Sequence, residues 1–149
     1  MSSGYDLRHA RVEAQKQKMR DLIKQGICAF CEEHFETYHD NPVEFQSEHW
    51  TVAKNDYPYT GTALHLLVVS RKHVSMFSEL APAARADFTE VLCEVEKRWK
   101  LPSYAVGIRV GEIEVNGGTV DHLHAHIVVG DVDDPGHEPV RFKMSSKRA

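Results

Sequence analysis

The chain of 149 residues is long enough for one domain with a proper hydrophobic core. Its 18 Lys and Arg residues and 22 Asp and Glu residues give a net charge of −4, which argues against a nucleic acid polymer or an anionic membrane as partner. No apolar run approaches membrane-spanning length, and the N-terminal region lacks the apolar stretch of a secretory signal. Three cysteines are too few for a secreted disulfide framework. We therefore expect a cytoplasmic protein.

The first half of the chain is predicted to begin with a helix and to continue into strands. Helix-favouring residues with an apolar stripe run over about 6–26, where Gly26 is a suitable helix end. Cys28 and Cys31 then form a C-x-x-C pair, followed by a polar stretch at 32–46 that we expect to be irregular. Two strands are predicted on either side of a loop at 55–61, one at 50–53 and one at 64–70.

The second half is predicted to contain a long helix and more of the sheet. Pro82 begins a helix whose apolar residues keep helical spacing as far as Trp99. Residues 104–115 alternate as a long strand, and Asn116-Gly117 is a turn pair that would fold this strand back onto the next one. The tail at about 131–149 is expected to be irregular apart from a short edge strand at 140–142. The sequence predicts an α+β fold with an antiparallel sheet.

Three histidines at every second position, His122, His124 and His126, are the most informative feature of the chain. Side chains alternate between the faces of a strand, so these three share one face while the apolar residues between them face the core. Crowding and partial burial disfavour the protonated form, and neutral imidazole acts as nucleophile, base or metal ligand. The preceding loop, Gly117-Gly118-Thr119, offers backbone N–H groups and a hydroxyl that suit an anionic oxygen.

Two chemistries could use this row of histidines. One is metal binding alone, in which alternate histidines hold zinc and leave an open position for water. The other is nucleophilic catalysis, in which one imidazole attacks a phosphoryl or nucleotidyl group and its neighbours position the leaving group. The Gly-Gly-Thr loop directly before the histidines favours the second chemistry.

Residues 118–128 resemble the signature of the histidine triad (HIT) superfamily, His-φ-His-φ-His-φ-φ after a loop with Gly, Ser or Thr, and Val. Three other segments are similar to family motifs in the same order, at 28–31, 55–59 and 65–73. The middle segment resembles the diadenosine polyphosphate hydrolase and phosphorylase branch. The resemblance implies a single HIT-like domain over 1–149, with about five antiparallel strands, a long helix packed on them and an N-terminal helical extension. It also implies a homodimer.

The resemblance further implies a nucleotide hydrolase or nucleotidyl transferase that acts on AMP-containing small molecules, such as dinucleoside polyphosphates or nucleoside phosphoramidates, without an organic cofactor. His124 would be the nucleophile that forms a nucleotidyl-histidine intermediate. The other candidate catalytic residues would contact the phosphate and the leaving group; they are His126, His65 and Thr119. The candidate substrate-binding residues are Asn55, His122, Gly117 and Gly118.

Zinc is a second implication of the resemblance. Many zinc-carrying members hold the metal with residues that correspond here to Cys28, Cys31, His73 and His122. Four protein ligands leave no open position, so this zinc ion would be structural and would tie the N-terminal segment to the sheet. The alternative is that Cys28 and Cys31 are simply two reduced, half-buried thiols.

The chain also departs from the family pattern. Gly111 and Gly118 stand where the family carries amide side chains, and Ser70 replaces its proline. These departures favour the main alternative function, a non-catalytic nucleotide-binding protein with a regulatory role. A third hypothesis is a zinc hydrolase that uses all three histidines of the row on the metal.

Overall fold

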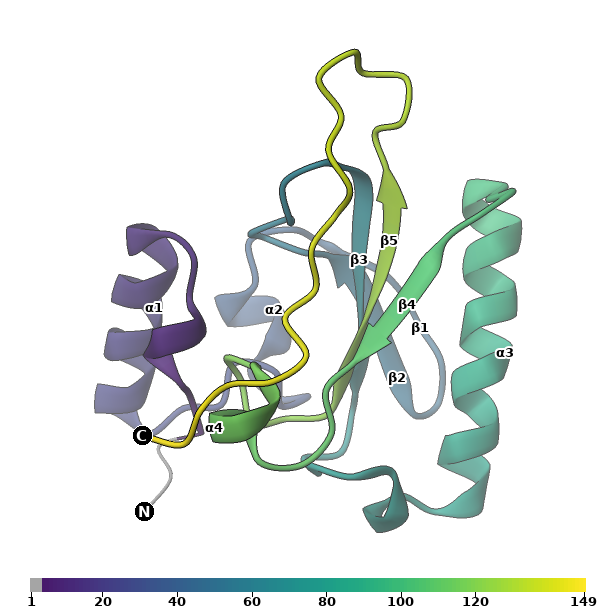
Figure 1. Ribbon diagram of the computed structural model, residues 1–149. Coiled ribbons are helices and arrows are strands. Elements are labelled where there is room, and N and C mark those ends of the chain that lie inside the picture. The colour runs from purple at the N-terminus through teal and green to yellow at the C-terminus, as the bar shows by residue number, and fades with distance from the viewer. Residues whose placement is uncertain (1–3) are drawn as a thin grey trace.

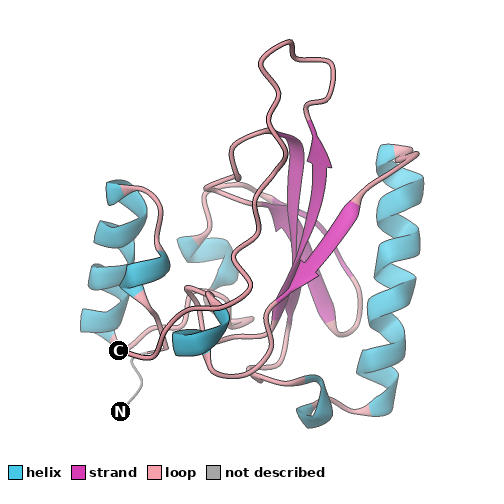
Figure 2. Cartoon of the chain, viewed as in Figure 1, coloured by secondary structure: helices cyan, strands magenta, loops and turns pink. Residues whose placement is uncertain are grey.

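The computed structural model describes residues 4–149, so residues 1–3 of the predicted domain lie outside the described part (Figures 1 and 2). It contains one antiparallel sheet with the strand order β1-β2-β3-β5-β4. The strands are β1 (Val43–Gln46), β2 (Trp50–Lys54), β3 (Thr62–Ser70), β4 (Ala105–Ile108) and β5 (His124–Gly130). The helices are η1 (Leu7–His9), α1 (Glu13–Gln25), α2 (Phe35–Tyr38), η2 (Phe77–Glu79), α3 (Pro82–Trp99) and α4 (Ile113–Asn116). The predicted α+β fold with about five antiparallel strands is confirmed.

The main core lies between α3 and one face of the sheet, as Figure 1 shows. Strand alternation turns Val68 of β3 and Ile127 of β5 toward α3, whose Val91 and Val95 meet them. All four side chains are buried, so this layer supplies most of the apolar burial of the domain. The same alternation turns the histidines of β5 to the opposite face of the sheet.

The opposite face of the sheet is covered by the two ends of the described chain, which we call the roof (residues 4–36 and 134–149). Figure 1 shows α1 on the side of the sheet away from α3, with the C-terminal tail running between α1 and the sheet. Met19 and Leu22 of α1 pack in a separate apolar cluster with Tyr5. A bridge between Tyr5 and Val120 joins the roof to the loop before β5. No helix within residues 4–149 is both long and apolar enough to cross a lipid bilayer.

The predicted helix at 6–26 is interrupted in the structure. It consists of η1 and α1, with extended backbone at Ala10 and Val12 between them. The carboxylate of Asp6 accepts a hydrogen bond from the backbone N–H of Arg8 at 3.0 Å, which favours a separate first turn. Gly26 ends α1 in the left-handed region with φ 67°, as predicted.

Three other sequence predictions are wrong. The stretch at 32–46 is not irregular throughout, because α2 lies within it and β1 pairs with β2 through Val43 and Ala53. The strand at 104–115 ends at Ile108, and α4 follows it, so Gly117 at φ 86° ends a helical turn instead of joining two strands. Even so, β4 pairs antiparallel with β5 as expected. The tail at 140–142 forms no strand.

Candidate active site

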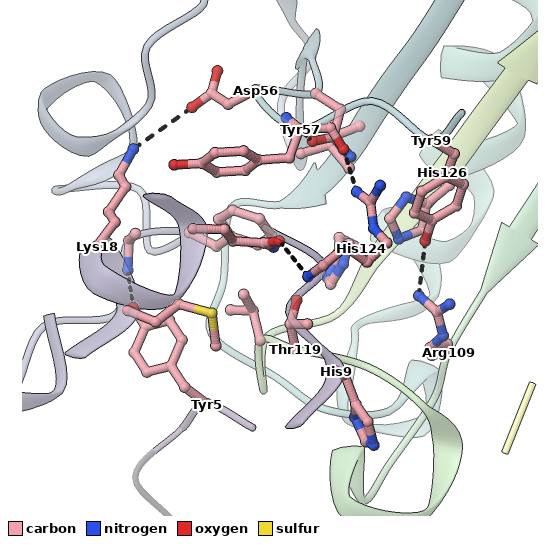
Figure 3. A pocket seen from close by; sticks show the side chains of 18 of the residues that line it. Tyr5, His9, Lys18, Asp56, Tyr57, Tyr59, Arg109, Thr119, His124 and His126 are labelled. Carbon is pink, nitrogen blue, oxygen red and sulfur yellow. Dashed lines mark hydrogen bonds and ion pairs between the residues drawn. The ribbon is translucent and has the colours of Figure 1, made fainter. Parts of the chain in front are cut away.

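A cavity of about 370 Å³ lies between the roof and the histidine face of the sheet (Figure 3). His124 and His126 line it from β5, together with Thr119 and Gly117 from the loop before that strand. Asn55, which follows β2, also lines the cavity. The structure therefore brings these sequence-predicted residues to one place, although they come from segments that are far apart in the chain.

His124 is held as a neutral imidazole with one nitrogen free. Its Nδ1 donates to the carbonyl oxygen of His122 at 2.6 Å, so the lone pair of the ring is on Nε2. The ring of Phe30 packs edge-on against it with centroids 4.9 Å apart. Burial lowers the pKa of His124 to about 4, so the ring is uncharged at neutral pH. A neutral imidazole fixed through its backbone hydrogen bond has the chemistry of a nucleophile.

His65 and His126 form a hydrogen-bonded pair whose proton positions follow from the backbone. The N–H of Tyr59 donates to Nδ1 of His65 at 3.1 Å, so the proton of neutral His65 is on Nε2. That N–H donates to Nδ1 of His126 at 2.9 Å, which places the proton of His126 on Nε2. Among the described residues this buried Nε2 has no hydrogen-bond partner. His126 thus keeps a buried N–H donor for an oxygen atom of a ligand.

Burial also keeps this pair neutral. It lowers the pKa of His65 to about 4 and that of His126 well below its usual value, and the nearby Arg11 and Arg109 lower both further. Asn55 lies against the pair, with its amide nitrogen 3.2 Å from Nε2 of His65. Its Oδ1 accepts from the backbone N–H of Tyr57 at 2.8 Å, which fixes the orientation of the carboxamide.

The loop before β5 uses most of its polar groups internally. The N–H of Gly118 donates to Oδ1 of Asn116 at 2.9 Å, and its carbonyl accepts from Nδ1 of His9 at 2.6 Å. Neither His65, His122 nor Gly118 is among the residues that line the cavity. The carboxamide of Asn116 is also bonded within its own loop, so it does not replace the missing family amide groups.

The predicted zinc ligands lie together beside the cavity. Nδ1 of His73 is 3.1 Å from Nδ1 of His122 and 3.2 Å from Sγ of Cys31. Nδ1 of His122 is also 3.6 Å from Sγ of Cys28, and the four ligand atoms are all within 4.8 Å of one another. A tetrahedral zinc ion with Zn–N bonds of about 2.0–2.1 Å and Zn–S bonds of about 2.3 Å sets its ligands roughly 3.3–3.8 Å apart. The cluster therefore fits zinc in both its donor types and its spacing.

The hydrogen bonding of His122 prepares it as a ligand. Its Nε2 donates to the carbonyl oxygen of Ser70 at 2.5 Å, which leaves the lone pair on the Nδ1 that faces the cysteines. Burial raises the pKa of the Cys31 thiol to about 12, so a thiolate at this position needs a cation beside it. Of the three histidines in the row only His122 belongs to this cluster, which argues against a metal held by all three.

Sequence reasoning missed several residues at this site. His9 was not singled out, yet its ring is buried against the Gly118 loop. Arg11 and Arg109 also line the cavity, and no local motif marks either of them. His39 belongs to no motif either, yet its side chain is only 5% exposed and its Nε2 is 3.2 Å from a carboxylate oxygen of Asp56.

The stability of the fold is expected to fall as the pH is lowered from about 6.5 to about 4, because of His65. Burial lowers the pKa of folded His65 to about 4, whereas in the unfolded chain it keeps the ordinary value of 6.5. Between these values the unfolded chain holds a proton that the folded protein does not, so acid favours unfolding. A shift of this size corresponds to about 3 kcal/mol of unfolding free energy.

Urea unfolding at a series of pH values across this window measures the effect. His65→Gln should show a weaker loss of unfolding free energy on acidification than the wild-type protein. His49→Gln is the matched control, because the side chain of His49 is 29% exposed and lies outside the cavity. It should keep the wild-type pH dependence. The same slope in all three proteins would rule out the assigned role of His65.

Comparisons with known proteins bear on the family and the fold. The HIT domain family model matches residues 37–133. A histidine triad nucleotide-binding protein from Candida albicans has a TM-score of 0.60 at 18% identity, covering 81% of this chain and 86% of that one. A HIT family hydrolase from Clostridium thermocellum has a TM-score of 0.56 at 21% identity, covering 77% and 96%. A search of curated proteins gave no match. Because the family model spans well over half of its length, this chain belongs to the HIT domain family.

Proposed function

We propose that this protein is a nucleotide hydrolase or nucleotidyl transferase in which His124 attacks the α-phosphorus of an AMP-containing substrate. The observation that supports this most directly is the state of His124. Its ring is neutral, its Nδ1 is occupied by a backbone carbonyl, and it lines a cavity large enough for part of a nucleotide. Membership of the HIT domain family supports the same class of reaction.

In the proposed first step, Nε2 of His124 forms a bond to phosphorus while the bond from phosphorus to the leaving oxygen breaks. The leaving group takes the electron pair, and the N–H on Nε2 of His126 donates a hydrogen bond to the developing charge. Thr119 also lines the cavity and carries a hydroxyl that can donate a hydrogen bond to a substrate oxygen. In the second step, water or another acceptor bonds to phosphorus, and the electron pair of the P–N bond returns to His124.

Covalent trapping tests this proposal. The protein is mixed with diadenosine tetraphosphate, quenched in alkaline denaturant because P–N bonds are acid-labile, and analysed by peptide mass spectrometry. We expect an added nucleoside monophosphate on the peptide that contains His124, and none in His124→Ala. His49→Ala, which changes a histidine outside the cavity, should form the adduct normally. Turnover without an adduct, or an adduct on another residue, would overturn the proposed mechanism.

The main alternative is a nucleotide-binding protein without catalysis, favoured by glycine at 111 and 118 in place of amide side chains. This alternative predicts that nucleotides bind and are recovered unchanged. The same trapping experiment separates the two, since a binder forms no adduct and releases no product.

We also propose that Cys28, Cys31, His73 and His122 hold a structural zinc ion. The support is the mutual spacing of their ligand atoms and the mixed thiolate and imidazole donor set. Bound there, the ion would cross-link the segment after α1 to the sheet and take no part in the chemical step. The homodimer and the cytoplasmic location stay predictions. Residues of the edge strand β4, such as Val106 at 39% exposure, are available for a dimer contact.

A further inference from the structure

The charged residues that line the cavity are mostly basic. Asp56 is the one carboxylate among the described lining residues, and the basic ones are Arg11, Lys18, Arg109, Arg141 and Lys143. Asp56 is itself engaged, 3.6 Å from Nζ of Lys18 and 3.2 Å from Nε2 of His39. In a chain of net charge −4 this is a local excess of positive charge, which favours an anionic ligand.

Two of these basic residues converge on one aromatic ring. The guanidinium carbon of Arg11 lies 4.5 Å from the ring centroid of Tyr59. Nη1 of Arg109 donates to the hydroxyl of Tyr59 at 3.1 Å. The ring of Tyr59 in turn stacks on that of His126, with centroids 5.3 Å apart and planes at 21°. Both arginines therefore lie near His126, whose Nε2–H is the proposed donor to the leaving group.

The two guanidinium groups retain donors for a ligand. Arg11 donates to the carbonyl oxygens of Tyr57 and Pro58, and Arg109 donates to Lys143 and Tyr59. Each guanidinium has five N–H donors, so part of this capacity is unused. Neither arginine forms an ion pair with a carboxylate anywhere in residues 4–149. An anion bound between them would supply the missing countercharge.

The two ends of the cavity differ in their residues, and His124 lies between them. Figure 3 shows Lys18 and Asp56 on one side of His124. Arg109 and His126 lie on the other side. Lys18 belongs to α1, whose apolar residues line the cavity as well, so that end suits the nucleoside. The end with Arg109 is then the position of the group that leaves.

We propose that Arg11 and Arg109 bind the leaving group and select one with at least two negative charges, such as a chain of phosphates, over a neutral or cationic amine. This inference rests on the proposed function. A phosphate chain departs as an anion: the P–O bond breaks, its electron pair goes to the leaving oxygen, and no proton has to be supplied. The guanidinium groups stabilise the charge that develops on that oxygen. An amine would need a proton on departure, and in its cationic form it would be repelled by the two arginines.

Arg11, which contributes to this selection, lies outside the segment matched by the family model, because that segment begins at residue 37. The extended backbone between η1 and α1 is what lets the Arg11 side chain reach Tyr57 and Tyr59. In this proposal, a residue of the N-terminal segment thus acts on a substrate group bound against the sheet. Arg11 is a specificity residue in this proposal, and His124 remains the nucleophile.

Direct binding of inorganic tripolyphosphate, measured by titration calorimetry, tests the proposal independently of turnover. Arg11→Gln should weaken binding about 10- to 100-fold, the effect expected for losing charged hydrogen bonds. Arg11→Lys, which keeps the charge, should recover part of it. Arg20→Gln is the matched control, because Arg20 is exposed on α1 and bonds to Glu13 instead of lining the cavity. Equal tripolyphosphate affinity in the wild type, Arg11→Gln and Arg109→Gln would overturn the proposal whatever the activity.

A second measurement compares substrates. The ratio of kcat/KM for diadenosine tetraphosphate to that for adenosine 5′-phosphoramidate should fall about 10-fold or more in Arg11→Gln. An unchanged ratio would overturn the selectivity, while a nucleotidyl adduct on His124 would leave the proposed function standing. Absence of both adduct and turnover in the wild type would instead overturn the proposed function, and tripolyphosphate binding would still decide the role of the arginines. Arg109→Gln provides the same comparison should Arg11→Gln fail to fold.

Discussion

Replacing His124 with alanine is expected to lower kcat at least about 10³-fold while nucleotide affinity changes by no more than about threefold. The reason is that Nε2 of His124 provides the bond to phosphorus, and the adjacent His126 in the same strand has no free lone pair to take its place. Nδ1 of His126 accepts from His65, and its Nε2 carries the proton. Steady-state kinetics and calorimetric titration with AMP measure the two quantities separately.

Added imidazole makes this experiment sharper. The alanine variant leaves space where the ring stood, so free imidazole can enter the cavity and restore part of the turnover. His126→Ala serves as a comparison, because losing a hydrogen-bond donor to the leaving group should cost less, about 10²- to 10³-fold. Near wild-type turnover in His124→Ala would show that another group is the nucleophile.

Replacing Cys31 with serine is expected to lower the melting temperature by about 10 °C or more through loss of zinc. Structural zinc contributes directly to folding free energy, and removing several kcal/mol from a domain of this size shifts the midpoint by roughly 2–4 °C per kcal/mol. Sγ of Cys31 lies 3.2 Å from Nδ1 of His73 and 3.8 Å from Nδ1 of His122, so a serine there removes a central ligand. Thermal melts followed by circular dichroism measure the shift.

Cys93→Ser is the matched control, because Cys93 is exposed and lies outside the cluster. Its melting temperature and metal content should equal those of the wild type. Elemental analysis should find about one zinc per chain in the wild type and Cys93→Ser, and much less in Cys31→Ser. Purified wild-type protein without zinc, whose melting temperature does not respond to added zinc, would refute the proposed metal site.

The elements that could be predicted from the sequence are those whose pattern is local. β2 and β3 are short apolar runs bounded by a loop, and α3 keeps helical spacing after Pro82. β1, Val-Glu-Phe-Gln, alternates apolar and polar residues as a strand does, but it was missed because the run is only four residues long within a polar stretch. The strand expected at 104–115 alternates as a strand should, yet Asn116 bonds back to the carbonyl oxygens of Val110 and Gly111 and so favours a helical turn.

The residues of the candidate site also divide into those with a local sequence pattern and those brought in by long-range contacts. The three histidines of the row lie close to one another in sequence, and so do the two cysteines. The spacing within each group therefore suggested its chemistry. Arg11 and Arg109 join the site through contacts with residues 46 to 50 positions away. Before folding, Arg11 is indistinguishable from the other charges of an amphipathic segment, which are usually solvated. Long-range contacts of this kind leave no periodic trace in one sequence.

The roof is interlocked, since Arg8 near one terminus donates to the carbonyl oxygen of Lys147 near the other. Tyr5 and Lys143, which are close in sequence to the two ends, also line the cavity. A fusion partner or an affinity tag at either end is therefore not a neutral addition. The family model matches residues 37–133 and so leaves the roof outside the match. Changes in the roof could therefore alter which molecules reach His124 and His126 while β5, which carries both histidines, stays the same.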